Sequence, residues 1–304
     1  METFNNDPNF SIVMRAGCNA ACAFCFNKEK KRPDSGGLNN FQWATNLLRT
    51  LETLPEQFYQ ISITGGEPMI SPAIFDVMSI CNMMKQRFTN ILLTTNGTNL
   101  LKYIDEVTAG VHHINVSRHH YDEHTNKSIF GGSYNVTDKE LAEIIDKYSA
   151  RGVDVSLNCV INDQTTINFI YEYIEFAKRV GAYAVRFRKE NGDSLEPTPC
   201  EKVIADKYPI LERGECPVCR TFKRVMCGLP VYWKAAIIEP TDKIKGKIYE
   251  LVYDVDGKLY LDWNRNVPYV PEEKPVKPSR PKTQYRVVAD NGHNSCGWSP
   301  RNRC

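Results

Sequence analysis

Residues 17–25, which read GCNAACAFC, follow directly on a short strand-like run, FSIVMR at 10–15. This stretch spaces Cys18, Cys22 and Cys25 as C-x3-C-x2-C. Cysteine thiolates hold iron–sulfur clusters, normally four to a cluster, so three from one short loop leave one iron open to a ligand from outside. A zinc site and three unmetallated thiols are the alternatives, but a structural zinc ion takes four protein ligands. The spacing therefore favours a cluster.

Strand-like and helix-like segments alternate around and after this loop. Strands are predicted at 10–15, 59–64, 91–95, 113–117, 153–161 and 182–187, and helices at 41–54, 74–84, 100–107, 137–149 and 167–180. Such repeats predict an α/β fold of parallel strands with helical crossovers, either barrel-like or doubly wound. Ligands gather at the carboxyl ends of such strands. The cysteine loop, GGE at 65–67, Asn96 and SRHH at 117–120 all follow predicted strand ends, so we expect one site built from several loops.

The character of the chain changes beyond Glu190. We expect a core domain over residues 1–195 and a C-terminal extension over residues 196–304 that covers the core. Tyr249–Trp263 (YELVYDVDGKLYLDW) predicts a β-hairpin with Asp256-Gly257 at its turn.

The extension also carries a second group of cysteines, Cys216, Cys219 and Cys227. An auxiliary iron–sulfur cluster, a zinc ion and unmetallated thiols are all open interpretations of this group. A fourth ligand is not obvious, and the candidates are Cys200, Cys296 and Cys304.

Composition and charge exclude several classes of function. A net charge of +2 gives no global field of the kind that gathers nucleic acid or an anionic membrane. No apolar run approaches the ~20 residues that span a bilayer, and METFNNDPNF at residues 1–10 lacks the pattern of a signal peptide. We expect a cytoplasmic protein without nucleic-acid or membrane partners. Grouped cysteines in that compartment indicate metal rather than disulfides.

With Phe24 between its last two cysteines, the loop resembles the signature of the radical S-adenosylmethionine (SAM) superfamily. TGGEP at 64–68 resembles that family's GGEP motif. TNGT at 95–98 resembles the TNG of its branch of peptide-modifying (SPASM-type) and molybdenum-cofactor-synthesising members. The likeness covers Phe10 to about Glu190. It implies a partial (βα)6 barrel, like part of a TIM barrel, ahead of the cysteine-containing extension.

The resemblance implies that Cys18, Cys22 and Cys25 hold a [4Fe–4S] cluster whose open iron binds the amino and carboxylate groups of SAM. It implies that the reduced cluster, supplied by a flavodoxin- or ferredoxin-type donor, cleaves SAM to methionine and a 5′-deoxyadenosyl radical. Glu67 is expected to accept a hydrogen bond from the SAM ammonium, although a carboxylate at a helix start is the alternative. The other expected SAM contacts are Phe24, Gly65, Gly66, Asn96, Ser117 and Arg188. For Asn96 and Ser117 the alternative is a structural role, either as a turn residue or as a strand-end cap.

Two stretches depart from the family pattern or extend it. Arg118, His119 and His120 stand where relatives usually have Asp-Gly, and we expect them to face substrate or SAM as catalytic residues. A solvated polar loop is the alternative. Arg186 and Arg188 share one face of their strand and are placed to meet a carboxylate or phosphate, unless one of them forms a structural ion pair.

The substrate is predicted as a small polar metabolite or a nucleotide-like molecule from which the radical abstracts hydrogen. A peptide maturase that installs a crosslink or epimerises a residue is the alternative, made less favoured because no peptide-recognition domain precedes the first predicted strand. A non-catalytic metal-binding protein is the distant alternative. Aromatic and basic residues show no interleaving on a nucleic-acid-binding module.

Overall fold

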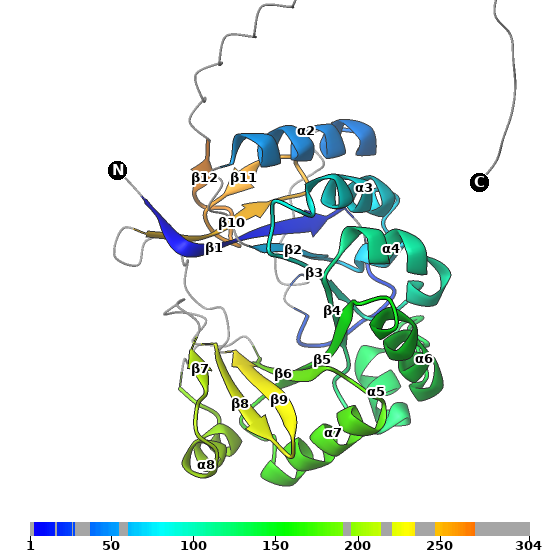
Figure 1. Ribbon diagram of the computed structural model, residues 1–304, viewed down its shortest axis with the longest axis vertical. Coiled ribbons are helices and arrows are strands. Elements are labelled where there is room, and N and C mark those ends of the chain that lie inside the picture. Colours follow the sequence, from blue (N-terminus) through cyan, green and yellow to red (C-terminus); the bar gives the residue numbers. More distant parts are fainter. Residues whose placement is uncertain are drawn as a thin grey trace, which may run out of the picture. The chain divides into compact units, whose positions relative to one another are not determined.

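Parallel strands in sequential order form the centre of the fold (Figure 1). The computed structural model describes residues 3–15, 17–25, 27, 37–54, 60–190, 196–213, 221–234 and 247–270. The central strands are β1 (Thr3–Met14), β2 (Gln60–Gly65), β3 (Asn90–Thr95), β4 (His113–Ser117), β5 (Asp154–Ile161) and β6 (Ala184–Lys189). Each pairs in parallel with the next. The predicted α/β core of six parallel strands is confirmed, and its consecutive order is that of a partial barrel.

Helical crossovers lie on the outer face of this sheet, from α2 at the top of Figure 1, along its right side, to α7 at the bottom. They are α2 (Asn40–Thr53), α3 (Ile74–Met84), α4 (Ile104–Gly110), α5 (Glu123–Phe130), α6 (Asp138–Ser149) and α7 (Ile167–Arg179). Helix α6 shows why they form: Thr137 and Glu140 make the predicted capping box, and Leu141 and Tyr148 are among the residues it buries. Helix α5 was not predicted. Within the described ranges, no helix is long and apolar enough to cross a membrane.

The segment after residue 195 extends the same sheet at both edges. Strand β9 (Leu229–Lys234) pairs in parallel with β6, followed outward by β8 (Phe222–Met226) and β7 (Glu212–Arg213). Strand β10 (Lys247–Tyr253) pairs in parallel with β1, followed outward by β11 (Leu259–Tyr260) and β12 (Pro268–Tyr269). Strands β10 and β11 make the predicted hairpin. Helix α8 (Pro199–Lys207) precedes β7, and the division at residue 195 stays a prediction.

Only part of the second cysteine group lies within the described residues. Cys227 is exposed at the turn between β8 and β9, where it has φ 51° and precedes Gly228. Cys200 is buried in α8 with its sulfur 3.2 Å from Thr198 Oγ1. The remaining members, Cys216, Cys219, Cys296 and Cys304, lie outside the described residues, so the auxiliary site stays a prediction.

The inner face of the sheet is polar where β10, β1 and β2 meet. Glu250 Oε1 accepts hydrogen bonds from Asn9 Nδ2 at 2.8 Å and Ser11 Oγ at 2.6 Å. Gln60 Nε2 and Ser62 Oγ both donate to Asn9 Oδ1, at 2.9 and 2.8 Å. These polar groups therefore satisfy one another, and this part of the interior is a structural network.

Strand β10 is fastened to α2 by a reciprocal pair of buried residues. Trp43 Nε1 donates to the Asp254 carbonyl at 2.9 Å, and Tyr253 Oη donates to the Trp43 carbonyl at 2.8 Å. The Trp43 and Tyr253 rings also contact one another, with centroids 5.2 Å apart. These contacts hold β10 against α2, although the two elements are about 200 residues apart in the sequence.

Tyr253→Phe is expected to lower the free energy of unfolding by about 1 to 2 kcal/mol, because it leaves a buried carbonyl without its donor. The measurement is urea denaturation followed by tryptophan fluorescence. Tyr249→Phe is the matched control on the same strand, since the Tyr249 hydroxyl makes no hydrogen bond with a described residue, and a change within about 0.5 kcal/mol is expected. Equal effects of the two substitutions would contradict the proposed fastening.

Candidate functional site

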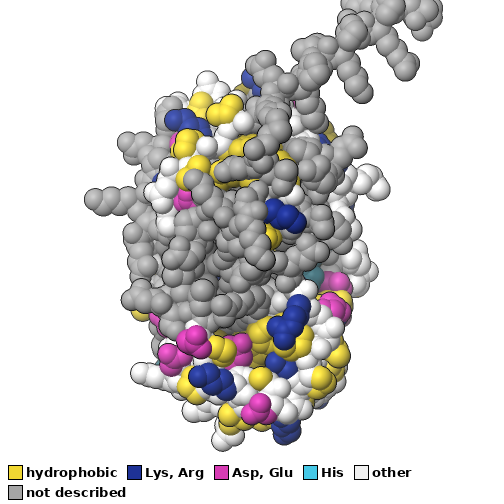
Figure 2. All heavy atoms as spheres, turned by 90° about the vertical axis from the view of Figure 1, so that its left-hand side faces the viewer, with side chains coloured by type: hydrophobic (Ala, Val, Ile, Leu, Met, Phe, Trp, Pro, Cys, Tyr) yellow, Lys and Arg dark blue, Asp and Glu magenta, His cyan; other side chains and the backbone are white. Residues whose placement is uncertain are grey.

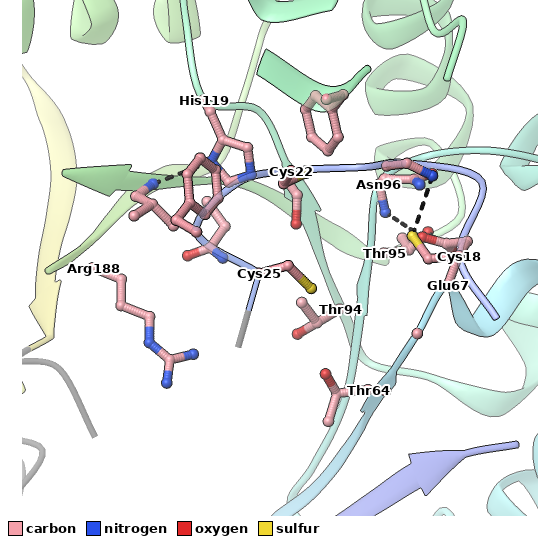
Figure 3. Close-up of a pocket in the computed structure, with 18 of the residues that line it drawn as sticks. Cys18, Cys22, Cys25, Thr64, Glu67, Thr94, Thr95, Asn96, His119 and Arg188 are labelled. Atoms are coloured by element: carbon pink, nitrogen blue, oxygen red, sulfur yellow. Dashed lines mark hydrogen bonds between the residues drawn. The ribbon is translucent and has the colours of Figure 1, made fainter. Parts of the chain in front are cut away.

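A pocket lies at the carboxyl ends of the central strands (Figure 3). Its wall comes from the cysteine loop and from the ends of β2 to β6, as expected for parallel strands. The lining residues are Cys18, Ala20, Cys22, Phe24, Cys25, Thr64, Gly65, Gly66, Glu67, Thr94, Thr95, Asn96, Ser117, His119, Phe130, Asn158, Val160, Arg188, Lys189 and Glu190. The structure therefore brings together every residue predicted as a cluster or SAM ligand, together with His119.

The three cysteines of the loop open onto this pocket. None is in a disulfide; Cys18 is exposed, and Cys22 and Cys25 are half-buried. In Figure 3 the Cys25 sulfur and the side chains of Thr64 and Thr94 turn toward the same space between the loop and the strand ends. Thiols placed this way are accessible to a metal cluster as well as to a second molecule beside it.

Asn19, inside the cysteine loop, ties that loop to the end of β3. Its Nδ2 donates to Thr98 Oγ1 at 2.9 Å, and its Oδ1 accepts from Asn96 Nδ2 at 2.8 Å. The side chain thus uses both of its polar atoms on the loop that follows β3. Sequence reasoning did not single out Asn19, and its position between two cysteines was the available signal.

A second tie comes from the loop after α5. Ala21 N donates to the Phe130 carbonyl at 2.6 Å, and Ser133 N donates to the Asn19 carbonyl at 2.8 Å. Gly132, with φ +61°, lies so close that a Cβ there would stand 2.5 Å from the Asn19 oxygen. This glycine is required both by its backbone conformation and by the close approach.

Glu67 is buried, with 1 % of its surface exposed, and joins three loops. Its Oε1 accepts from Thr95 Oγ1 at 2.5 Å and from Met69 N at 3.0 Å, and its Oε2 accepts from Asn96 N at 2.7 Å. Its own N–H donates to the Gly17 carbonyl at 2.8 Å, at the start of the cysteine loop. Burial raises the pKa of Glu67 to about 7, and the donors from Asn96, Thr95 and Met69 act in the opposite direction.

Gly65, at the end of β2, approaches β1 too closely for any side chain. It has φ +136°, and a Cβ there would stand 2.7 Å from Met14 N. Gly65 and Met14 are register partners in the parallel ladder. The glycine therefore lets β2 turn into the pocket without displacing β1.

His119 lines the pocket as a buried, neutral imidazole. Burial and the positive charge of Arg118 lower its pKa to about 3. Its Nδ1 accepts from Val160 N at 3.2 Å, and its ring packs edge-on against Phe24 with centroids 4.8 Å apart. Phe130 contacts its other side at 4.9 Å. Through Phe24, His119 supports the cysteine loop as well as facing the cavity.

Arg118 and His120 do not line the pocket. Arg118 has 1 % of its surface exposed, and its guanidinium donates to Asp138 Oδ1 at 2.5 Å and lies over the Phe176 ring. Side chains alternate along a strand, so a residue that follows Ser117 points to the opposite side of the sheet. His120 Nδ1 accepts from Asp122 N at 2.9 Å in the following turn. This geometry gives no support to the predicted catalytic roles of Arg118 and His120.

The pocket also includes side chains that sequence reasoning left out. They include Thr64 on β2, Thr94 on β3 and Asn158 on β5. The alternation of side chains along each strand, which places them on the pocket wall, is visible in the sequence. Lys189 Nζ bonds to the Glu196 carbonyl at 2.7 Å, and Asn162 Nδ2 donates to Glu190 Oε2 at 3.3 Å. These contacts join the rim near β6 to Asn162, directly after β5, and to Glu196, in the segment that follows β6.

Comparison with known proteins agrees with this geometry. The sequence profile described as Radical SAM superfamily matches residues 12–177, which is more than half of the chain. The chain belongs to the radical SAM superfamily. It is an enzyme, and membership implies a [4Fe–4S] cluster and SAM as its cofactors.

Several curated relatives match part of the chain. A GTP 3′,8-cyclase of Aliarcobacter butzleri is 26% identical over 211 residues, covering 63% of this chain and 60% of the relative. A 7-carboxy-7-deazaguanine synthase of Methanothermobacter thermautotrophicus is 27% identical over 168 residues, covering 52% and 64%. An S-adenosylmethionine-dependent nucleotide dehydratase of Flammeovirga pacifica is 25% identical over 186 residues, covering 56% and 59%. The chain thus spans about three fifths of the length of these relatives.

Among solved structures, Streptococcus suis SuiB bound to its precursor peptide SuiA superposes with a TM-score of 0.49 at 19% identity. The match covers 62% of this chain and 40% of SuiB.

Thr95→Val is expected to lower the free energy of unfolding by roughly 1.5 to 3 kcal/mol, because it removes a donor from the buried Glu67 carboxylate. The measurement is urea denaturation at pH 8. Thr94→Val is the matched control, since the neighbouring Thr94 also lines the pocket and its hydroxyl makes no hydrogen bond with a described residue. A loss of stability in the control as large as in Thr95→Val would remove the special role of the Thr95 hydroxyl.

The pH dependence of stability follows from the pKa of Glu67, which burial raises from 4.5 to about 7. As pH rises from about 4.5 to about 7, the unfolded state releases this proton while the folded state keeps it, so the folded state loses stability on the order of 3 kcal/mol. Glu67→Gln removes this dependence. The free energy of unfolding of wild type minus that of the variant should therefore fall between pH 5 and pH 8. A constant difference over that range would show that Glu67 titrates at its ordinary value.

Proposed function

We propose that Cys18, Cys22 and Cys25 bind the [4Fe–4S] cluster and that SAM binds in the pocket beside them. The observation that carries this proposal is the convergence, in one pocket, of the three thiols with the glycine-lined end of β2 and with Glu67. When bound, the cluster and SAM supply a one-electron cleavage that yields methionine and a 5′-deoxyadenosyl radical.

The three cysteines are not gathered in the way that the ligands of one metal ion are. Among the described His, Cys, Asp and Glu side chains, no three gather closely enough to hold one metal ion. The thiolates of a [4Fe–4S] cluster each bind a different iron, so they stand further apart than the ligands of one zinc ion. The arrangement is therefore no obstacle to a cluster on this loop.

Glu67 retains a position for the SAM ammonium. A carboxylate oxygen accepts two hydrogen bonds. Oε1 is filled by Thr95 and Met69, whereas Oε2 accepts only from Asn96 N among the described residues. The second position of Oε2 is available for a charge-assisted hydrogen bond. Glu67 therefore serves both as a support of the loops and as a SAM ligand.

The substrate we propose is a small polar metabolite or a nucleotide-like molecule from which the radical abstracts hydrogen. Polar side chains of β5 and β6, Asn158 and Arg188, line the same pocket. Figure 3 shows Arg188 on the side of the pocket opposite Glu67. Relatives named as a GTP cyclase and a nucleotide dehydratase support a substrate of this kind. A flavodoxin- or ferredoxin-type protein is the proposed electron donor.

A nucleic-acid polymer is not proposed as the substrate. The whole chain carries a net charge of only +2. Figure 2 shows one face of the molecule, and among its described atoms Lys and Arg side chains are interspersed with Asp and Glu side chains. Nucleic-acid binding is driven by clustered positive charge, so this distribution favours a small molecule.

The Cys18/Cys22/Cys25→Ala variant is expected to lose the cluster and with it all SAM cleavage, because the proposed ligands are gone. After anaerobic purification, the measurements are iron per chain, absorbance near 400 nm and 5′-deoxyadenosine formed with dithionite. A wild type with about four irons at this site is expected.

Cys81→Ala is the control for this variant, because Cys81 is buried in the core on α3, away from the pocket. It should keep the iron and the cleavage activity. If the triple variant keeps its iron and still forms 5′-deoxyadenosine, the proposed function is wrong.

A further inference from the structure

Strands β4, β5 and β6 carry buried polar groups on the inner face of the barrel that lack partners. Ser156 Oγ on β5 and Arg186 Nε on β6 are buried without a hydrogen-bond partner in the described part of the chain. His113 and Asn115 on β4 have only 7% of their surface exposed. Leaving such groups unsatisfied lowers the stability of the folded chain. This region differs from the satisfied network around Glu250, and an unpartnered set of this kind indicates a ligand.

The strand register places Arg186 next to the pocket already described. Arg186 pairs in register with Asn158 on β5, which lines the pocket, and with Tyr232 on β9. Arg188, two residues further on, also lines the pocket. Because side chains alternate along a strand, Arg186 lies on the same face as Arg188, one step deeper in the barrel. Ser156 precedes Asn158 by two residues and shares this face.

The charge of Arg186 has no counter-ion within the described residues. Its guanidinium lies over the Tyr232 ring, 4.4 Å from the centroid. It forms no hydrogen bond or ion pair with a described residue. Burial lowers its pKa, whereas Tyr232 and Tyr183 act in the opposite direction. Burial and the charge of Arg186 lower the pKa of His113 to about 3, which leaves His113 neutral. Within the described residues, the groups found to act on the charge of Arg186 are two tyrosines, and no carboxylate is among them.

A guanidinium presents a planar fork of donors that matches carboxylate and phosphate oxygens. A half-buried one without an acidic partner is stabilised by an anionic ligand, because Coulomb attraction is stronger away from bulk water. The Tyr232 ring covers one face of the guanidinium. An anion binds in the plane of this group, where its N–H donors point.

We infer that Arg186, together with the Ser156 hydroxyl, binds an anionic group of the substrate, a phosphate or a carboxylate. The inference rests on the proposed function, since the substrate is the molecule acted on in the adjoining pocket. The anionic end is held deep between β5, β6 and β9, and the reacting end extends toward the cysteine loop. Arg186 is then a residue that determines substrate specificity.

The test is equilibrium binding by calorimetry to the anaerobic, cluster-containing full chain with SAM present, at fixed ionic strength. The ligands are GTP, which carries phosphates; guanosine, which carries none; and citrate, which carries carboxylates. We expect GTP or citrate to bind the wild type at least tenfold more tightly than guanosine. Arg186→Met should weaken that binding roughly 10- to 100-fold, the value of charge-assisted hydrogen bonds.

Arg224→Met is the matched control. Arg224 is also buried, also lies over an aromatic ring (Phe222, 4.9 Å) and also has an Nε without a partner, but it lies on the opposite face of the sheet. It should bind the anion like the wild type. If Arg186→Met does not fold, Arg186→Lys, which keeps the charge but lacks the fork, should weaken binding at least severalfold.

Tighter binding of GTP than of citrate would identify the anionic group as a phosphate. Tighter binding of citrate would identify it as a carboxylate. The inference is wrong if neither anion binds the wild type, if guanosine binds as tightly as the preferred anion, or if the Arg186 variants bind that anion like wild type. Uncoupled 5′-deoxyadenosine formation is measured on the same samples. Its absence in wild type would contradict the proposed function, whereas an Arg186→Met variant that still cleaves SAM and has lost anion binding supports the inference alone.

Discussion

The buried carboxylate of Glu67 is the interaction on which the site depends. Its backbone N–H holds the start of the cysteine loop at Gly17, and its side chain holds Thr95 and Asn96 after β3. Three loops that come from different strands therefore meet at one residue. Asn19 adds a second connection between the cysteine loop and the loop after β3, because its side chain forms hydrogen bonds with Asn96 and Thr98. The cysteine loop is thus positioned by the strand ends rather than by its own short sequence.

Much of the core and the site follows from local sequence signals. Alternating strand and helix periodicity predicted six parallel strands, and cap residues such as Thr137 marked helix starts. The cysteine loop, GGE at 65–67 and Asn96 were predicted to meet because parallel strands end at one edge, and they line one pocket. Their roles in holding a cluster and SAM stay predictions.

Other features lacked a local signal or were misread. Helix α5 is short and mostly polar, so its periodicity is weak. The pairing of β10 with β1 joins segments more than 200 residues apart, which no local pattern reports. Arg118 was expected at the site because it follows the end of a predicted strand, but the strand alternation after Ser117 directs its side chain toward Asp138. Asn19 was overlooked because its importance lies in partners from another loop.

In the proposed site, the cysteine loop holds three irons of its cluster and leaves the fourth iron for SAM. Electron paramagnetic resonance of the dithionite-reduced full chain, recorded with and without SAM, measures this directly. We expect the signal of a reduced [4Fe–4S] cluster, with a line shape that changes when SAM is added, because SAM binds the iron that Cys18, Cys22 and Cys25 do not hold. A missing cluster signal, or one that SAM leaves unchanged, would contradict it.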